Sequence, residues 1–125
     1  MALNLISDIV QKTLKKVAGN VYNSFADEGI EPLYVIHIEE EFPTYGKAGL
    51  MYFTATSTVI VVDTLPENVQ NVMEDIRVAM EGMESEGDVK VYGCRMADSS
   101  RQTNYSEEDR LWYCSAEYEI DYSLT

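Results

Sequence analysis

The stretch that decides the fold is residues 50–62, LMYFTATSTVIVV, followed directly by DTLPENVQNVMEDIRVAM at residues 63–80. The first segment is rich in β-branched residues and alternates with period two, which is typical of a strand. One side is predicted to face the core, and the other to face solvent or another subunit. The two sides are Met51, Phe53, Ala55, Val59 and Val61 against Tyr52, Thr54, Thr56 and Thr58.

The second segment predicts an amphipathic helix that contributes to the core. Apolar residues recur at helical spacing from Val69 to Met83, and glycines at 82 and 87 end the pattern. Thr64, followed three residues later by Glu67, has the spacing of a capping box, and proline is tolerated in a first helical turn. We therefore expect Thr64 to cap this helix.

Before this unit, residues 3–22 place apolar side chains at spacings of three and four, which predicts another amphipathic helix. Residues 33–38, LYVIHI, predict a buried strand opened by Pro32. The stretch from Glu39 to Gly49 holds three glutamates, a proline and two glycines, so a long loop is expected there.

After the unit, residues 89–96 and 110–124 predict two more strands joined by a polar connection at 97–109. The last strand alternates cleanly between core residues and a polar row. If the hairpin is centred near Asn104, Cys94 and Cys114 face one another on the core side, and we read them as buried reduced thiols. The polar row holds Glu117, Glu119 and Asp121.

The predicted order is αββαββ in a single domain spanning residues 1–125. This order indicates an α+β fold, with two helices packed on one face of a mostly antiparallel four-stranded sheet. Neither a repeat nor a second domain is evident.

The charge is strongly unbalanced, with 22 acidic and 9 basic residues and a formal net charge of −13. The apolar content of 46% is too high for a disordered acidic chain. Acidic surfaces repel phosphate and anionic lipid, so binding to duplex DNA or to a membrane is not expected. Short apolar stretches and an N-terminus without a signal-peptide pattern favour a soluble intracellular protein. The one basic segment is the first helix, whose Lys12, Lys15 and Lys16 either stabilise its C-terminal end or bind a partner.

The sequence gives little support for a catalytic function. His37, the sole histidine, lies between isoleucines and is interpreted as structural. No nucleophile and base are paired, and zinc-ligand spacing and a phosphate-binding glycine loop are both missing from the sequence. The carboxylate clusters 39–41 and 107–109 lack EF-hand spacing and are interpreted as solvated loop charge. We expect no enzyme activity, no cofactor and no metal site.

The pattern as a whole resembles the tail terminator proteins of long-tailed bacteriophages and prophages, with the related tail-completion and minor tail families. The segments that carry the resemblance are PLYVIHIEEEFPTYGKAGLMYFTATSTVIVVDT and the following helix ENVQNVMEDIRVAM. It extends from LNLISDIVQKTLKKV to LWYCSAEYEIDYSL, nearly the whole chain.

The resemblance implies a structural virion protein in the tail or neck, assembled in the host cytoplasm. It implies a homohexameric ring that caps the tail tube, stops its polymerisation and offers an interface to the head connector, while DNA passes through the centre without being bound. By position, the candidate interface residues are Phe42, Tyr45, Lys47, Arg101, Asn104 and Tyr105. Because acidic side chains repel passing DNA, Glu117, Glu119 and Asp121 are the candidates to line the lumen.

Two other classes of function compete with this one. An acidic DNA mimic, or another small phage regulatory protein, would occupy the basic groove of a nuclease or repressor. Scattered acids and a basic helix count against a mimic. A small enzyme or ligand-binding module would need a deep apolar pocket with converging polar groups.

Overall fold

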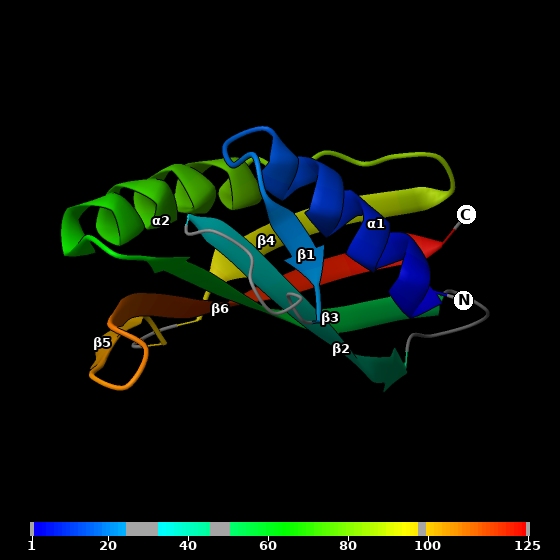
Figure 1. Cartoon of the computed structure of the whole chain (residues 1–125). Coiled ribbons are helices and arrows are strands. Elements are labelled where there is room, and N and C mark those ends of the chain that lie inside the picture. Colours follow the sequence, from blue (N-terminus) through cyan, green and yellow to red (C-terminus); the bar gives the residue numbers. More distant parts are fainter. Residues whose placement is uncertain (1, 25–32, 46–50, 98–99, 125) are drawn as a thin grey trace.

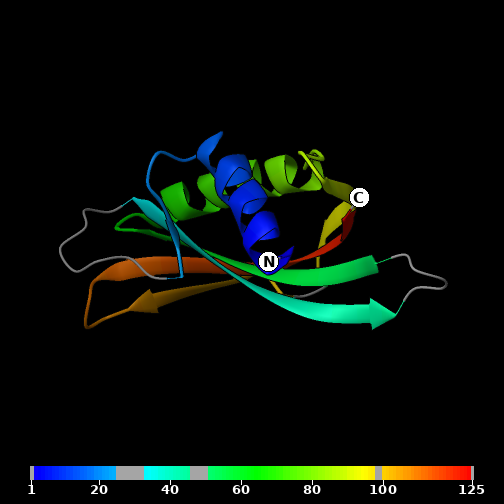
Figure 2. The ribbon, with the colours of Figure 1, turned by 90° about the vertical axis from the view of Figure 1, so that its right-hand side faces the viewer.

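The computed structural model describes residues 2–24, 33–45, 51–97 and 100–124. Within these residues, two helices lie on one face of a six-stranded, mostly antiparallel sheet, and the other face carries no helix (Figures 1 and 2). The α+β prediction is therefore confirmed, with six strands where four were expected. The elements are α1 (Ala2–Lys15), β1 (Val21–Asn23), β2 (Tyr34–Tyr45), β3 (Met51–Asp63), α2 (Pro66–Glu81), β4 (Val89–Met96), β5 (Gln102–Ser106) and β6 (Leu111–Leu124).

The spatial order of the strands is β1-β2-β3-β6-β4, and β5 pairs with the beginning of β6. The two long strands β3 and β6 are neighbours at the centre, paired from Tyr52 with Ser123 to Asp63 with Trp112. All pairs are antiparallel except β1 with β2, which is parallel over three residues. The hydrophobic alternation of β3 and β6 follows from this position, because one face meets the helices and the other does not.

The core lies between the two helices and the sheet. The apolar side of α1 and the methionine-rich side of α2 are fully buried, which confirms both amphipathic predictions. Burying a side chain of this size contributes roughly 1.5–3 kcal/mol, so the helix–sheet layer supplies most of the hydrophobic stabilisation. The buried members are Ile6, Ile9, Val10 and Leu14 of α1, Val69, Met73, Ile76 and Met80 of α2, and Val21, Val35, Ala55, Val59, Val61, Val89, Cys94, Cys114, Ala116, Tyr118, Ile120 and Tyr122 of the sheet.

The expected loop after residue 38 is wrong for its first part, because β2 continues to Tyr45. Glu39 is buried within this strand, and Pro43 pairs with Phe53 of β3. A proline is tolerated on an edge strand where its nitrogen points away from the neighbouring strand. This condition is met at Pro43. Alternate residues of a strand point their backbone N–H and C=O groups to the same side, and those of Val35 and His37 point away from β3, toward the segment that contains β1. Pro43 is an even number of residues from both, so its nitrogen also points away from β3.

The structure also differs from the sequence prediction at the end of the first helix and in two strands that were not predicted. Helix α1 ends at Lys15, short of residue 22, and Val21 belongs to β1. The polar connection at 97–109 contains β5. Both missed strands are short or exposed, so neither shows a hydrophobic alternation that could have revealed it.

The predicted capping box is also wrong. The N-cap of α2 is Leu65, with no capping side chain, and Pro66 opens the helix. Asp63 orders the turn instead, because its carboxylate accepts hydrogen bonds from the Thr64 backbone N–H at 2.7 Å and from the Asn68 side chain at 2.6 Å. The strand end therefore determines where the helix begins.

Cys94 and Cys114 are both buried on the helix side as free thiols, in line with the prediction. The predicted pairing between them is wrong, because Cys94 lies opposite Ile120 and Cys114 lies opposite Val61 and Thr103. The wide β4–β6 connection contains β5 and displaces the expected register by six residues along β6.

Candidate assembly surfaces

The face of the sheet that carries no helix is divided into an apolar half and a polar half. Cross-strand register aligns Tyr34, Val62 and Tyr113 in one row and Ile36, Ile60 and Ser115 in the next. The following rows turn polar, from Ile38, Thr58 and Glu117 to Glu40, Thr56 and Glu119, and then to Thr54 and Asp121. The polar half begins where the aliphatic residues of β2 and β3 give way to glutamate and threonine.

The predicted acidic row is found on this open face, because its members alternate with the buried residues of β6. Two of its three carboxylates share a cation. Arg95 of β4 donates from Nη2 to Glu119 at 2.6 Å and from Nη1 to Asp121 at 3.1 Å, and Asp121 also accepts from Thr54 at 3.0 Å. Hydrogen bonding and charge from Asp121 and Glu119 raise the pKa of the Arg95 guanidinium. Glu119 and Asp121 are therefore joined with Arg95 and Thr54 in a hydrogen-bonded network, which sequence alone did not reveal.

Arg95 reduces the negative charge of the open face without cancelling it. Among the described residues, Glu40 and Glu117 are exposed on this face with no ion pair recorded. Lys90 of β4 shares the face and lies 5.3 Å from the centre of the Tyr92 ring. The described open face thus holds four carboxylates, Glu40, Glu117, Glu119 and Asp121, against the two cations Lys90 and Arg95.

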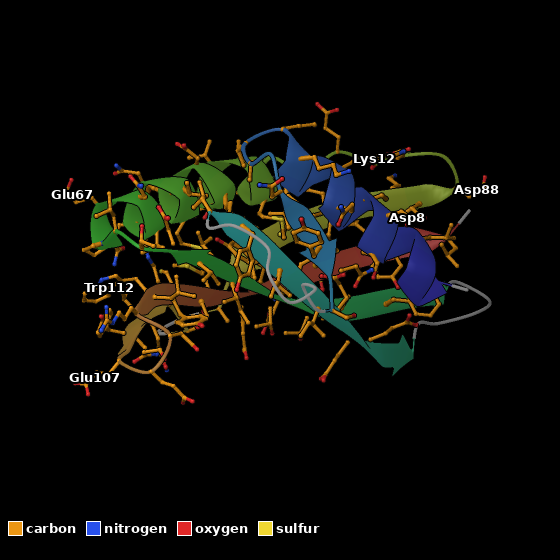
Figure 3. The ribbon with its side chains drawn as sticks, viewed as in Figure 1. Asp8, Lys12, Glu67, Asp88, Glu107 and Trp112 are labelled. Carbon is orange, nitrogen blue, oxygen red and sulfur yellow. The ribbon has the colours of Figure 1, made fainter. Side chains whose placement is uncertain are left out.

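At one end of the molecule, β5 lies against the start of β6, close to the first turns of α2 (Figure 3). Of the predicted interface residues there, Arg101 is engaged within the chain, donating to Glu74 at 3.0 Å and to the Gln70 side chain at 2.7 Å. Asn104 is exposed. Tyr105 is 46% exposed and packs against Trp112 with ring centres 4.9 Å apart and ring planes tilted by 47°. Tyr105 and Asn104 therefore remain available for contact, whereas Arg101 fastens β5 to α2.

The other predicted interface residues lie at the opposite end of the sheet. The backbones of Phe42 and Tyr45 belong to β2, not to a loop, and pair with Thr54 and Met51. Their side chains and the whole of Lys47 lie outside the described residues. Because this part of β3 pairs with the end of β6, the two predicted sets are separated along the length of β6 and do not form one patch.

His37 is fully buried, and its ring contacts two polar side chains, Glu39 and Gln11. Its Nδ1 lies 2.8 Å from Oε1 of Glu39, its Nε2 contacts Oε1 of Gln11, and Ser57 donates to Oε2 of Glu39 at 2.7 Å. Serine, histidine and a carboxylate meet here, but the carboxylate of Glu39 stands between the other two. His37 and Ser57 each bind Glu39, and they do not contact one another. This order cannot activate a nucleophile, so the structural interpretation of His37 fits the geometry.

The remaining chemistry of the described residues is also structural in character. Burial raises the pKa of the Cys94 thiol to about 12, which leaves little thiolate for reaction. A hollow of about 450 Å³ is an open depression on the first turns of α2, lined by Pro66, Glu67, Gln70 and Asn71. Within the described ranges, no cluster of metal-ligating side chains is found and no helix is long and apolar enough to cross a membrane.

No protein-family model and no curated protein matches the sequence. The fold, however, matches 28 chains of solved structures. One of them is a chain of a structure described as the virion of a native gene transfer agent particle. It superposes with a TM-score of 0.74 over 91% of this chain and 91% of that chain, at 10% sequence identity. At this identity the likeness establishes a shared fold across nearly the full length of both chains.

Proposed function

We propose that the protein is a structural component of a phage-like virion and that, within the virion, it is the tail terminator. The observation that carries the proposal is the fold shared over 91% of both chains with a component of a gene transfer agent virion. It agrees with the resemblance to tail terminators drawn independently from the sequence. The hydrogen-bonded His37 and the buried thiols leave the described residues without an arrangement suited to catalysis, which fits an assembly role.

In this role, copies of the chain form a ring, by analogy a hexamer, that binds the last ring of the tail tube and stops its growth. The opposite side of the ring offers the docking surface for the head connector. The separation of Phe42 and Tyr45 from Asn104 and Tyr105 along the sheet supports two distinct contact regions on each copy.

The open sheet face faces the lumen in this proposal. Its four carboxylates outnumber its two cations, so the wall repels the phosphates of passing DNA. Arg95 holds Glu119 and Asp121 in fixed positions, and the wall is therefore acidic without being a dense block of like charge.

The experiment that tests the proposal removes the gene from a strain that produces the particle, followed by electron microscopy of the product. We expect tails of uncontrolled length and heads without tails, and restoration by the wild-type gene. Particles with normal tails joined to heads would rule out the terminator role. In parallel, native mass spectrometry of the purified protein is expected to show a ring-sized oligomer.

The competing role as a DNA mimic makes a different prediction. A mimic competes with duplex DNA for a nuclease or repressor, whereas a terminator leaves such binding unchanged. On the open face, two of the four carboxylates are bound to Arg95 and so cannot imitate a free row of phosphates.

A further inference from the structure

The buried polar cluster around His37 has no part in the proposed function, and its geometry determines where its protons lie. The side chains of His37 and Glu39 are both 0% exposed. They stand two residues apart on the helix-facing side of β2, where α1 and β1 meet the sheet (Figure 1). A buried charge is costly unless it is paired and hydrogen-bonded, so the protonation state of this pair matters for the fold.

The orientation of the Gln11 amide is set by β1. Its Nε2 donates to the backbone carbonyl of Val21 at 3.0 Å, which places Oε1 against Nε2 of His37. Turning the amide over would set its oxygen against the Val21 carbonyl oxygen and leave two acceptors facing each other. Because an amide oxygen only accepts, Nε2 of His37 must carry a hydrogen.

The other ring nitrogen faces a carboxylate. Nδ1 of His37 lies 2.8 Å from Oε1 and 3.0 Å from Oε2 of Glu39, and Oε2 also accepts from Ser57 at 2.7 Å. A single N–H shared between two equivalent acceptors fits this two-oxygen contact, whereas a carboxylic acid would offer one O–H to the ring. This contact favours a hydrogen on Nδ1 as well.

We infer that His37 is held in the folded protein as an imidazolium, donating to Glu39 and Gln11, and that this charged joint fastens α1 and β1 to the sheet. The joint connects Gln11 of α1, the Val21 carbonyl of β1, His37 and Glu39 of β2, and Ser57 of β3. Without a hydrogen on Nδ1, a nitrogen lone pair would face the Glu39 carboxylate.

The groups packed around the joint leave Glu39 as the counterion of His37. In the contacts described, α1, β1 and β3 contribute an amide, a backbone carbonyl and a hydroxyl, none of which is charged. The next carboxylate on the same side of β2, Glu41, accepts a hydrogen bond at 3.2 Å from Tyr122 of β6. Removing the charge of Glu39 is therefore expected to remove the second proton of the ring.

The test uses the fact that the sequence contains one histidine, so ¹⁵N-labelled histidine gives a single ring spectrum. We expect both ring nitrogens of the wild-type protein to resonate as protonated nitrogens. In Glu39→Gln the new amide donates to Nδ1, and the ring is expected to change to the neutral form protonated on Nε2. Ser57→Ala is the matched control, because it removes a hydrogen bond from Glu39 but keeps the charge, and it should leave both nitrogens protonated.

An unprotonated Nδ1 in the wild-type spectrum would overturn the inference, as would a doubly protonated ring in folded Glu39→Gln. The wild-type spectrum decides alone if that variant does not fold. Hydrogen exchange of the backbone amides tests whether the cluster holds α1 and β1 on the sheet. Glu39→Gln should lower protection at least tenfold more in α1 and β1 than in β6, and a uniform loss across the fold would contradict a local joint. Neither result bears on the terminator role, which the deletion experiment tests separately.

Discussion

Two buried tyrosines of β6 differ in whether the hydroxyl group has a partner. Tyr122 donates to Glu41 at 3.2 Å, whereas within the described residues the buried hydroxyl of Tyr118 has no hydrogen-bond partner. Burial raises the pKa of Tyr118 to about 12, as expected for a phenol shielded from water. A buried polar group without a partner loses its hydration and gains nothing in return, so the two hydroxyls make opposite contributions to stability.

We predict that Tyr118→Phe leaves the free energy of unfolding unchanged or raises it by up to about 1 kcal/mol, because it removes an unsatisfied hydroxyl. Tyr122→Phe, the matched control, should lower it by about 1–3 kcal/mol, because it removes a hydrogen bond to a carboxylate. Urea unfolding followed by Trp112 fluorescence measures both variants. Destabilisation of more than about 1 kcal/mol in Tyr118→Phe would mean that the hydroxyl does have a partner, such as a bound water.

The thiols give a second prediction at the scale of single residues. Because burial raises the pKa of Cys94 to about 12, the thiolate is scarce at pH 8, and Cys114 is 0% exposed. We expect almost no reaction of the native protein with a thiol reagent at pH 8. After unfolding without reductant, two thiols per chain should react promptly. Fewer than two reactive thiols in the unfolded chain would indicate a disulfide or another modification.

At the scale of elements, the β3–α2 junction tests which residue orders the start of the helix. Asp63 is 6% exposed and binds both the Thr64 N–H and Asn68, whereas the Thr64 hydroxyl lies 3.4 Å from the Asp63 carboxylate. We predict that Asp63→Ala lowers the free energy of unfolding by about 1–2 kcal/mol, comparable to the loss of a helix cap. Thr64→Ala should cost less than about 0.5 kcal/mol, in the range of ordinary surface substitutions. Urea unfolding measures both variants. A larger loss of stability in Thr64→Ala than in Asp63→Ala would mean that Thr64 caps the helix, as the sequence predicted.

The outer edge of β2 leads to a prediction about aggregation. Beyond His37, β1 no longer covers this edge, and Pro43 occupies a position whose backbone nitrogen points outward. Edge strands that lack protection invite pairing with other chains, and proline blocks this by removing a donor. Pro43→Val is therefore expected to increase aggregation, measured by light scattering during prolonged incubation. Thr103→Val on β5, also an exposed edge strand, provides a comparison, and equal aggregation in both would argue against a specific role of the proline.

The elements that sequence alone predicted are those whose burial is periodic. Strands β3 and β6 and helix α2 combine long apolar repeats with central positions, so local pattern and tertiary packing agree. Strand β5 is exposed at most positions and β1 has three residues, so neither bears a hydrophobic signal. Their existence depends on pairing with a distant strand, which the local sequence does not encode.

Glu39 was misread for a related reason. Three consecutive glutamates indicate a solvated loop, yet Glu39 is buried because His37 on the same strand and Ser57 on β3 provide partners for its carboxylate. One signal was available, since residues 37 and 39 share a face if the strand continues. Alternation alone separates Glu117, Glu119 and Asp121 from the core residues of β6, and the structure has the same alternation. The pairing of this row with Arg95 depends on the β4–β6 register, including the irregularity between Val91 and Gly93.

At the scale of the whole molecule, charge and shape are distributed unevenly between the two faces of the sheet. Both helices cover one face (Figure 2). The acidic network and the partly exposed isoleucines therefore lie together on the other. The helix-covered side also carries acidic residues, including Glu67 and Asp75 on the exposed part of α2. If the open face lines a passage for DNA, a change of charge on that face must alter affinity for DNA more than an equal change of charge on α2.

We predict that Glu40→Lys combined with Glu117→Lys creates measurable affinity for duplex DNA, whereas we expect none for the wild-type protein. Both glutamates are exposed on the open face, and neither has a recorded ion pair among the described residues. Fluorescence anisotropy of a labelled duplex at increasing salt measures the effect. Every phosphate that the new lysines neutralise should steepen the slope of log affinity against log salt by about 0.9.

The control, Glu67→Lys with Asp75→Lys, makes the same change of net charge on the opposite side of the sheet. In a ring whose lumen is formed by the open face, DNA meets cations from several copies at once, so the open-face variant should bind at least tenfold more tightly than the control. Equal affinities would mean that net charge alone governs binding, and the open face would then have no special relation to DNA. Since both variants carry the same total charge, the comparison separates where the charges lie from how many there are.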